Sequence, residues 1–234
     1  MKSLKRSAAS LGIAAALAVF SVAHAVPTIR ITDGVTTVII QDNIGADASS
    51  TAGFVSYTAP AGTFAGWSVI LSAGTTKPLI GSVTSPEIDL NWNITRSGPG
   101  SGALTVSFSE NGFSLAGATP VIAATGGTLG TVANTALVRT YYDAGNVELA
   151  TTTLLTSHSF SGPGAFGAND GGSAPADPSV AFTVKVDLNQ AAGQISSGEI
   201  HLYTSVPESG SMIAFLGTAL VALGFVAMRR KVTA

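Results

Sequence analysis

The chain has 234 residues, with 13 acidic and 11 basic side chains and no cysteine. Without cysteine there can be neither a disulfide framework nor a thiolate metal site, so stability must come from a packed core. Between residues 26 and 205 there are 12 acidic and 5 basic residues, a net charge of −7. A surface of that sign argues against nucleic acid as a partner, because nucleic-acid binding needs clustered Lys and Arg.

The first 25 residues have the pattern of a secretory signal peptide. The basic residues that open it are Lys2, Lys5 and Arg6. An apolar run over residues 11–22 follows, and Ala23-His24-Ala25 then forms a small-residue cleavage site, with Ala23 and Ala25 as the residues that signal peptidase reads. We therefore expect export and a mature chain that begins at Val26.

Residues 26–205 predict a single all-β domain. Short runs rich in β-branched residues recur at spacings near ten residues, and sustained helical periodicity is missing. The expected strands are 28–32, 35–40, 54–58, 66–71, 87–94, 103–109, 120–124, 135–142, 147–155, 180–188 and 199–204. Such a pattern favours an antiparallel sandwich, for which a jelly roll is one possible form, with a barrel as the alternative.

Turn residues separate these runs. Asp33-Gly34 is a hairpin pair between the first two strands, and turns are also expected at Glu110-Asn111-Gly112, at Gly126-Gly127 and from Asp143 to Asn146. Residues 161–179, in which glycine and proline alternate, are predicted to form a long loop.

Two carboxylates suggest one kind of chemistry. Glu87 and Asp89 are two apart on an expected strand, hence on one face and roughly 7 Å apart, a separation compatible with an inverting glycosidase. The alternative is an ordinary solvated strand face with charges that oppose aggregation.

His158 and His201 are the two histidines of this region. His158 lies between Ser157 and Ser159, as a hydrolase triad could use it, but the chain has no G-x-S-x-G elbow.

Asp42, Asn43 and Asp47 surround Gly45 in one turn and offer hard oxygen ligands, so Ca²⁺ is a possible cofactor there. The spacing differs from that of an EF-hand, and the same residue types are ordinary turn formers. Asp170 and Asp177 invite the same two interpretations. Apart from this possible Ca²⁺, we expect no cofactor.

Aromatic side chains could stack on sugar rings. Trp67 and Trp92 are expected in the core and not on a binding platform. Tyr141 and Tyr142 are adjacent on an expected strand, so they should point to opposite faces and one should be exposed.

The C-terminus has three parts. The polar motif is Val206, Pro207, Glu208, Ser209 and Gly210. The 18 uncharged residues 211–228 follow and would give a helix of roughly 27 Å, long enough to cross a bilayer core. The basic cluster Arg229, Arg230 and Lys231 then holds this end on the cytoplasmic side.

This arrangement over residues 206–231 resembles the PEP-CTERM class of bacterial C-terminal sorting signals, which exosortases process in Gram-negative envelopes. The commonest form reads Pro-Glu-Pro, and here Ser209 replaces the second proline. The motif is closer to the variant Val-Pro-Asp-Ser-Gly, with Glu208 in place of aspartate. The alternative is a plain membrane anchor.

A second resemblance rests on the order of four motifs: Asp33-Gly34 before a Val/Ile strand, Asp42-Asn43 in a turn, residues 77–81, and residues 86–91 before a strand. In this order, most of residues 26–204 resembles a group of uncharacterised exported bacterial proteins that carry the same kind of signal, from which no catalytic residue can be transferred. The resemblances imply an exosortase-type enzyme and signal peptidase as processing partners, transit through the inner membrane, and exopolysaccharide as a companion at the cell surface or outside. We expect an exported protein that is not an enzyme, with an exported glycan-binding or glycan-hydrolysing protein as the alternative.

Overall fold

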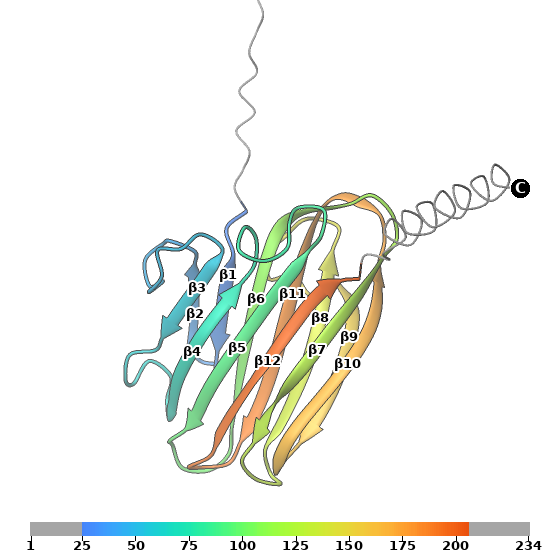
Figure 1. The fold of residues 1–234 in the computed structure, drawn as a ribbon. Helices are drawn as coiled ribbons and strands as arrows, with labels where there is room; N and C mark the ends of the chain where they lie inside the picture. The colour runs from blue at the N-terminus through green and yellow to red at the C-terminus, as the bar shows by residue number, and fades with distance from the viewer. Residues whose placement is uncertain (1–24, 206–234) are drawn as a thin grey trace, which may run out of the picture.

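In the computed structural model, which describes residues 25–205, twelve antiparallel strands form two six-stranded sheets that face each other (Figure 1). The first sheet has the order β2-β1-β6-β11-β8-β9 and the second β10-β7-β12-β5-β4-β3. The strands are β1 (Thr28–Thr32), β2 (Thr37–Gln41), β3 (Phe54–Thr58), β4 (Trp67–Thr75), β5 (Glu87–Arg96), β6 (Gly102–Leu115), β7 (Thr119–Leu129), β8 (Thr135–Asp143), β9 (Thr153–Ser161), β10 (Gly164–Ala174), β11 (Asp177–Gln190) and β12 (Ile195–Thr204). The predicted all-β sandwich is confirmed for this part of the chain.

Eight of these strands follow the order of a jelly roll. From β5 to β12 the chain supplies β5-β12-β7-β10 to one sheet and β6-β11-β8-β9 to the other. The first strand of the eight therefore pairs with the last, as two interlocked Greek keys require. Strands β1 to β4 extend both sheets on one side, and the hairpin of β1 and β2 turns at the predicted Asp33-Gly34.

The core lies between the sheets, and along a strand every second side chain points into it. On β5 the buried residues are Ile88, Leu90, Trp92 and Ile94, each at most 2% exposed. Because successive side chains of a strand point to opposite faces, the residues between them project from the outer face. The expectation that both tryptophans belong to the core is confirmed: Trp67 is 6% exposed and Trp92 2%.

Several predicted turns and boundaries are wrong. Gly126-Gly127 lies within β7, and Glu110-Asn111-Gly112 lies within β6, where β11 pairs with shifted register. The strand predicted at 147–155 begins only at Thr153, because the turn after β8 continues past Asn146. Paired glycines predict a turn, but Gly126 and Gly127 lie in β7, a strand that pairs with a neighbour on each side.

The predicted loop at 161–179 is also wrong. Most of it is β10, which pairs with β7 along its whole length from Gly164 to Ala174. The small residues fit a close approach to β9, since a Cβ on Gly172 would lie 2.9 Å from the backbone oxygen of Leu155. Close packing, and not backbone freedom, explains glycine at this position.

Tyr141 and Tyr142 do not divide between a buried and an exposed face. Both are buried, at 6% and 3% exposure. The pairing of β8 with β9 shifts by one residue between Thr140 and Tyr141. Tyr142 packs edge-on against Phe182, whereas the guanidinium of Arg139 lies over Tyr141 at 6.0 Å.

The predictions for both termini lie outside the described residues. These are the signal peptide up to residue 24, the sorting motif at 206–210, the membrane helix at 211–228 and the basic cluster at 229–231. Within residues 25–205 no helix has the length and apolar character needed to cross a bilayer.

Candidate functional site

The outer face of the second sheet carries a row of polar side chains on two neighbouring strands. Their register aligns Glu87 with Tyr203, Asp89 with His201 and Asn91 with Glu199. We call this surface the polar face, and its members are Glu87, Asp89, Asn91 and Asn93 of β5 and Ser197, Glu199, His201 and Tyr203 of β12. The predicted placement of Glu87 and Asp89 on one strand face is confirmed.

Side-chain contacts hold the polar face in place. His201 Nε2 lies 2.7 Å from Glu87 Oε1, and these side chains are about one third exposed. The amide of Asn91 donates to both carboxylate oxygens of Asp89 at 3.2 Å. The ring of Tyr203 is tilted against that of His201, with centroids 5.0 Å apart. Two hydrogen-bonded pairs and one ring contact therefore fix these side chains on the polar face.

Asp89 is the most perturbed carboxyl of the polar face. Burial raises its pKa to about 6, and the negative charges of Glu199 and Glu87 act in the same direction. The charge of His201 and the hydrogen bond from Asn91 oppose the rise. A carboxyl whose pKa has moved towards neutrality can give up or take up a proton near pH 6.

A shallow hollow of about 460 Å³ lies beside Glu199 on this sheet. Gly126 of β7 pairs with Glu199 on one side and with Gly167 of β10 on the other, so the face has no side chains there. The hollow is lined by Asn91, Trp92, Asn93, Gly126, Gly127, Ser197, Gly198 and Glu199. Polar side chains thus surround a floor of glycine, although Glu87 and Asp89 lie outside the lining.

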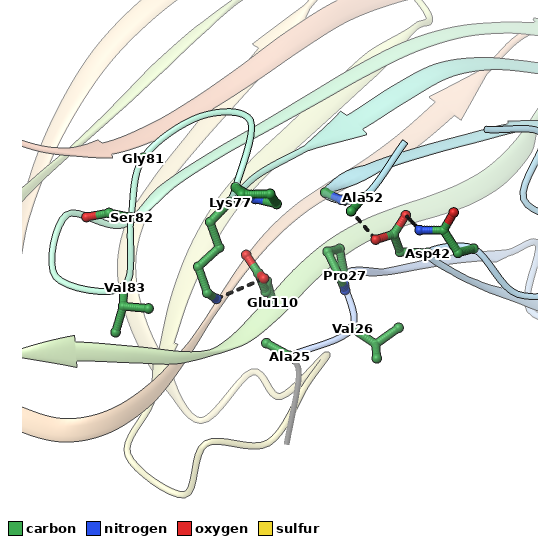
Figure 2. Close-up of a pocket in the computed structure, with 13 residues that line it drawn as sticks. Ala25, Val26, Pro27, Asp42, Ala52, Lys77, Gly81, Ser82, Val83 and Glu110 are labelled. Carbon is green, nitrogen blue, oxygen red and sulfur yellow. Dashed lines mark hydrogen bonds and ion pairs between the residues drawn. The ribbon is translucent and has the colours of Figure 1, made fainter. Parts of the chain in front are cut away.

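A second cavity of about 580 Å³ lies at the start of the described chain, and we call it the N-terminal pocket (Figure 2). Lys77 and Glu110, which both line it, form an ion pair, with Lys77 Nζ 2.8 Å from Glu110 Oε1. Thr76 donates to the other oxygen of Glu110, and the Lys77 ammonium lies 3.8 Å from the centroid of the Phe113 ring. Burial raises the pKa of Glu110, whose side chain is only 2% exposed, while its hydrogen bonds oppose that rise.

The lining of the N-terminal pocket is mostly apolar or small. It consists of Ala25, Val26, Pro27, Asp42, Asn43, Ala52, Gly53, Lys77, Pro78, Gly81, Ser82, Val83 and Glu110. The sequence did not indicate this pocket, because its three charged residues, Asp42, Lys77 and Glu110, are more than 30 positions apart and form no recognisable motif.

The candidate Ca²⁺ ligands use their carboxylate oxygens within the loop. Asp47 accepts hydrogen bonds from the backbone N–H groups of Asn43, Ser49 and Ser56. Asp42 accepts one from the Gly53 N–H and one from the Asn43 side chain. Among residues 25–205 no group of three or more acidic, histidine or cysteine side chains is arranged to hold a metal ion.

His158 reaches across from β9 to β10. Its Nδ1 lies 3.1 Å from Asp170 Oδ2, and its ring stacks on Phe160 at 4.5 Å. The described hydrogen bonds join no serine hydroxyl to this ring, so the nucleophile of a triad has no counterpart within residues 25–205. Asp177, the other acidic residue of the expected loop, accepts from the Ser179 N–H and from Tyr142.

Sequence reasoning missed Asn91, Glu199 and Tyr203 as members of one surface. Their alternation along β5 and β12 was readable, since Glu199, His201 and Tyr203 are spaced two apart. What could not be read was that β12 lies beside β5.

Comparisons with known proteins add little. No protein-family model matches the chain, and no curated protein does. Among solved structures, TmCBM61 in complex with β-1,4-galactotriose is 13% identical, with a TM-score of 0.32 over 59% of this chain and 88% of that one. The enzymatically active domain of tailspike protein 4 from bacteriophage CBA120 is 11% identical, with a TM-score of 0.29 over 58% of this chain and 19% of that one. Similarity at this level carries no argument about function.

Proposed function

We propose that this chain is an exported, non-catalytic protein of a Gram-negative cell envelope or extracellular matrix, and that its sandwich binds a glycan on the polar face. Signal peptidase would remove residues 1–25. The segment 206–231 would hold the protein in the inner membrane during transit and be read there by an exosortase-type enzyme. The motifs at the two ends support delivery, whereas the polar face supports glycan binding.

The observation that carries glycan binding is the hollow beside Glu199. Sugars present many hydroxyl groups, and the hollow offers amide, hydroxyl and carboxylate partners around an open glycine floor. The adjacent rings of His201 and Tyr203 add apolar surface for the faces of a sugar. The hollow is shallow and open, so a polysaccharide longer than the site could lie across it.

Charge narrows the ligand class. Glu87, Asp89 and Glu199 are acidic, and His201 is the one basic member of the polar face. Acidic polysaccharides would be repelled by these carboxylates, so the proposal is for a neutral glycan.

Filling the hollow tests the proposal. A Cβ on Gly126 would meet only the Phe166 carbonyl oxygen, at 3.8 Å, so Gly126→Val should fold normally while its side chain occupies the hollow. In affinity gels that contain neutral polysaccharides, we expect the wild-type protein to be retarded and the variant to lose at least about tenfold in affinity, or about 1.4 kcal/mol. Gly117→Val is the matched control, because nothing lies within 4 Å of its Cβ and it lies in the turn before β7, nine positions from Gly126.

If no neutral polysaccharide retards the wild-type protein, or if Gly126→Val binds as well as the wild type, the polar face is not a glycan site. Binding to acidic polysaccharides alone would contradict the ligand class.

Glycan hydrolysis is the second candidate, and the raised pKa of Asp89 is the observation that favours it. A general acid in a glycosidase has such a pKa, with a second carboxylate nearby. Binding without hydrolysis is favoured because Asp89 and Glu87 lie on an open strand face outside the hollow. The same samples decide: release of reducing ends by the wild-type protein, lost in Asp89→Asn, would establish the enzyme.

A further inference from the structure

The start of the described chain is held firmly next to a carboxylate. The Asp42 N–H donates to the Pro27 carbonyl at 3.0 Å, which fixes the beginning of β1. The Thr28 hydroxyl lies 2.9 Å from the Val26 carbonyl oxygen and 2.8 Å from Glu148 Oε2. The Thr28 hydroxyl thus links this residue to the carboxylate, and the backbone of Val26 is close enough to lower the pKa of Glu148 against the effect of burial. The backbone nitrogen of Val26 therefore has a defined position beside Glu148.

Near Val26 two carboxylates interact with a single ammonium group. Glu110 and Glu148 are close enough to influence each other, and Lys77 is the cation that acts on both. Lys77 Nζ lies 2.8 Å from Glu110 Oε1 and donates to the Asn111 carbonyl at 2.7 Å. None of the ion pairs within residues 25–205 includes Glu148. This half-buried carboxylate has only neutral hydrogen-bond donors, and burial raises its pKa.

The expected signal-peptide cleavage would supply the missing cation at this position. Cutting the bond between Ala25 and Val26 turns the amide nitrogen of Val26 into an α-ammonium, while strand β1 stays in place. The carboxylates of Glu110 and Glu148 would then interact with the ammonium groups of Lys77 and Val26.

We propose that Glu148 is the acceptor site for the mature amino terminus, so that removal of the signal peptide completes an ion pair between the Val26 ammonium and the Glu148 carboxylate. This inference rests on the export part of the proposed function and is independent of glycan binding. A new N-terminus that docks on its own chain makes the folded exported protein more stable than its precursor.

The charged groups around Val26 decide how the pair responds to pH. Glu148, after β8, lies beside it, whereas Lys77 after β4, Glu110 on β6 and Asp42 after β2 line the same pocket as Val26. An α-ammonium has an ordinary pKa of about 7.7–8.0, and a neighbouring carboxylate raises it in the folded protein. While Glu148 is ionised, the stabilisation is therefore fully present below about pH 7.7 and is lost as the pH rises through the folded-state value of the ammonium; it is also lost at low pH, where Glu148 takes up a proton.

A double-variant cycle tests the pair in the full-length gene, exported by a Gram-negative host. The four proteins are the wild type, Glu148→Gln, a form with one glycine inserted between Ala25 and Val26, and the combination of both changes. The insertion moves the ammonium by about 3.8 Å without removing it. At pH 7 we expect each single change to lower Tm by about 2–4 °C and the combination to lower it no further. At pH 10 the amine is neutral, so the coupling between the two changes should vanish.

Additive effects at pH 7, or coupling that persists at pH 10, would overturn the ion pair, as would a mature N-terminus of the wild type other than Val26 in the intact mass. Glu199→Gln is the matched control, because this exposed carboxylate of β12 lies on the polar face and should not couple with the insertion. Glycan binding should be the same in all four proteins of the cycle. Loss of binding in the wild type would contradict the glycan site and leave the ion pair standing.

Discussion

At the scale of residues, two carboxyl groups on the same strand of the polar face have different hydrogen-bond partners. Asp89 and Glu87 are two positions apart, yet His201 pairs with Glu87, and Asp89 receives its hydrogen bonds from Asn91. Asp89 is also affected by the charge of Glu199, which lies on the neighbouring strand. Together with burial, these surroundings set the pKa of Asp89 at about 6.

This arrangement predicts a pH dependence of stability. The pKa of Asp89 is about 6 in the folded protein, compared with about 3.9 in an unfolded chain. The folded state therefore binds this proton more tightly, and stability falls as the pH rises from about 4 to about 6. We expect Asp89→Asn to raise Tm relative to the wild type at pH 7.5 and to change it little at pH 4, as measured by calorimetry.

Asp187→Asn is the control with the opposite sign. The pKa of Asp187 is lowered by hydrogen bonds from Thr105 and Arg139, which outweigh its burial. Its replacement should cost stability at pH 7.5. Equal pH profiles for the wild type and Asp89→Asn would show that Asp89 titrates normally.

At the scale of elements, the edges of the sheets differ in how they are protected. β9 and β10 end their respective sheets and lie close together, with a Cβ on Gly172 only 2.9 Å from Leu155. β2 ends the first sheet on the other side, and its Ile39 is 57% exposed. An apolar edge strand with free backbone groups is a template for pairing with another chain.

We therefore predict that β2 is the site of self-association at high concentration. Ile39→Lys places a charge on this edge and should reduce association, measured by light scattering, with Tm unchanged within about 1–2 °C because the side chain contributes little to the core. Val132→Lys is the matched control, since Val132 is 76% exposed in the turn after β7 and not on a strand edge. If both variants reduce association equally, general charge is responsible and not the edge.

At the scale of the whole molecule, the sandwich continues almost to the sorting motif. β12 ends at Thr204, and the Ser205 N–H still donates to the Pro120 carbonyl at 3.1 Å. The motif that an exosortase-type enzyme would read begins at the next residue. From the proposed membrane span at 211–228 we therefore predict that, before processing, the folded domain lies directly against the membrane.

Processing is predicted to leave a defined product. Intact mass of the native protein from the medium should give a species that begins at Val26 and lacks the residues beyond Ser211. Membrane fractions should contain the precursor with residues 212–234. If membranes contain only full-length tails and the medium contains no protein, the C-terminal segment is a permanent anchor.

The sequence by itself determined those features that depend on neighbours along the chain. Alternation in β5 indicated which side chains are buried, so the outward position of Glu87 and Asp89 and the burial of Trp92 were predictable. The motifs at the two ends likewise consist of contiguous residues. Such patterns are local, because a period of two assigns each residue to a face whatever its partner strand is.

Only the tertiary structure decided which strands are neighbours. His201 meets Glu87 across 114 positions, and Lys77 meets Glu110 across 33, through pairings that depend on the whole topology. The glycine-rich β10 is a strand because β7 supplies hydrogen bonds and β9 requires small residues, and neither condition is visible in its own sequence. Both the hollow beside Glu199 and the carboxylate beside Val26 arise from such long-range pairing.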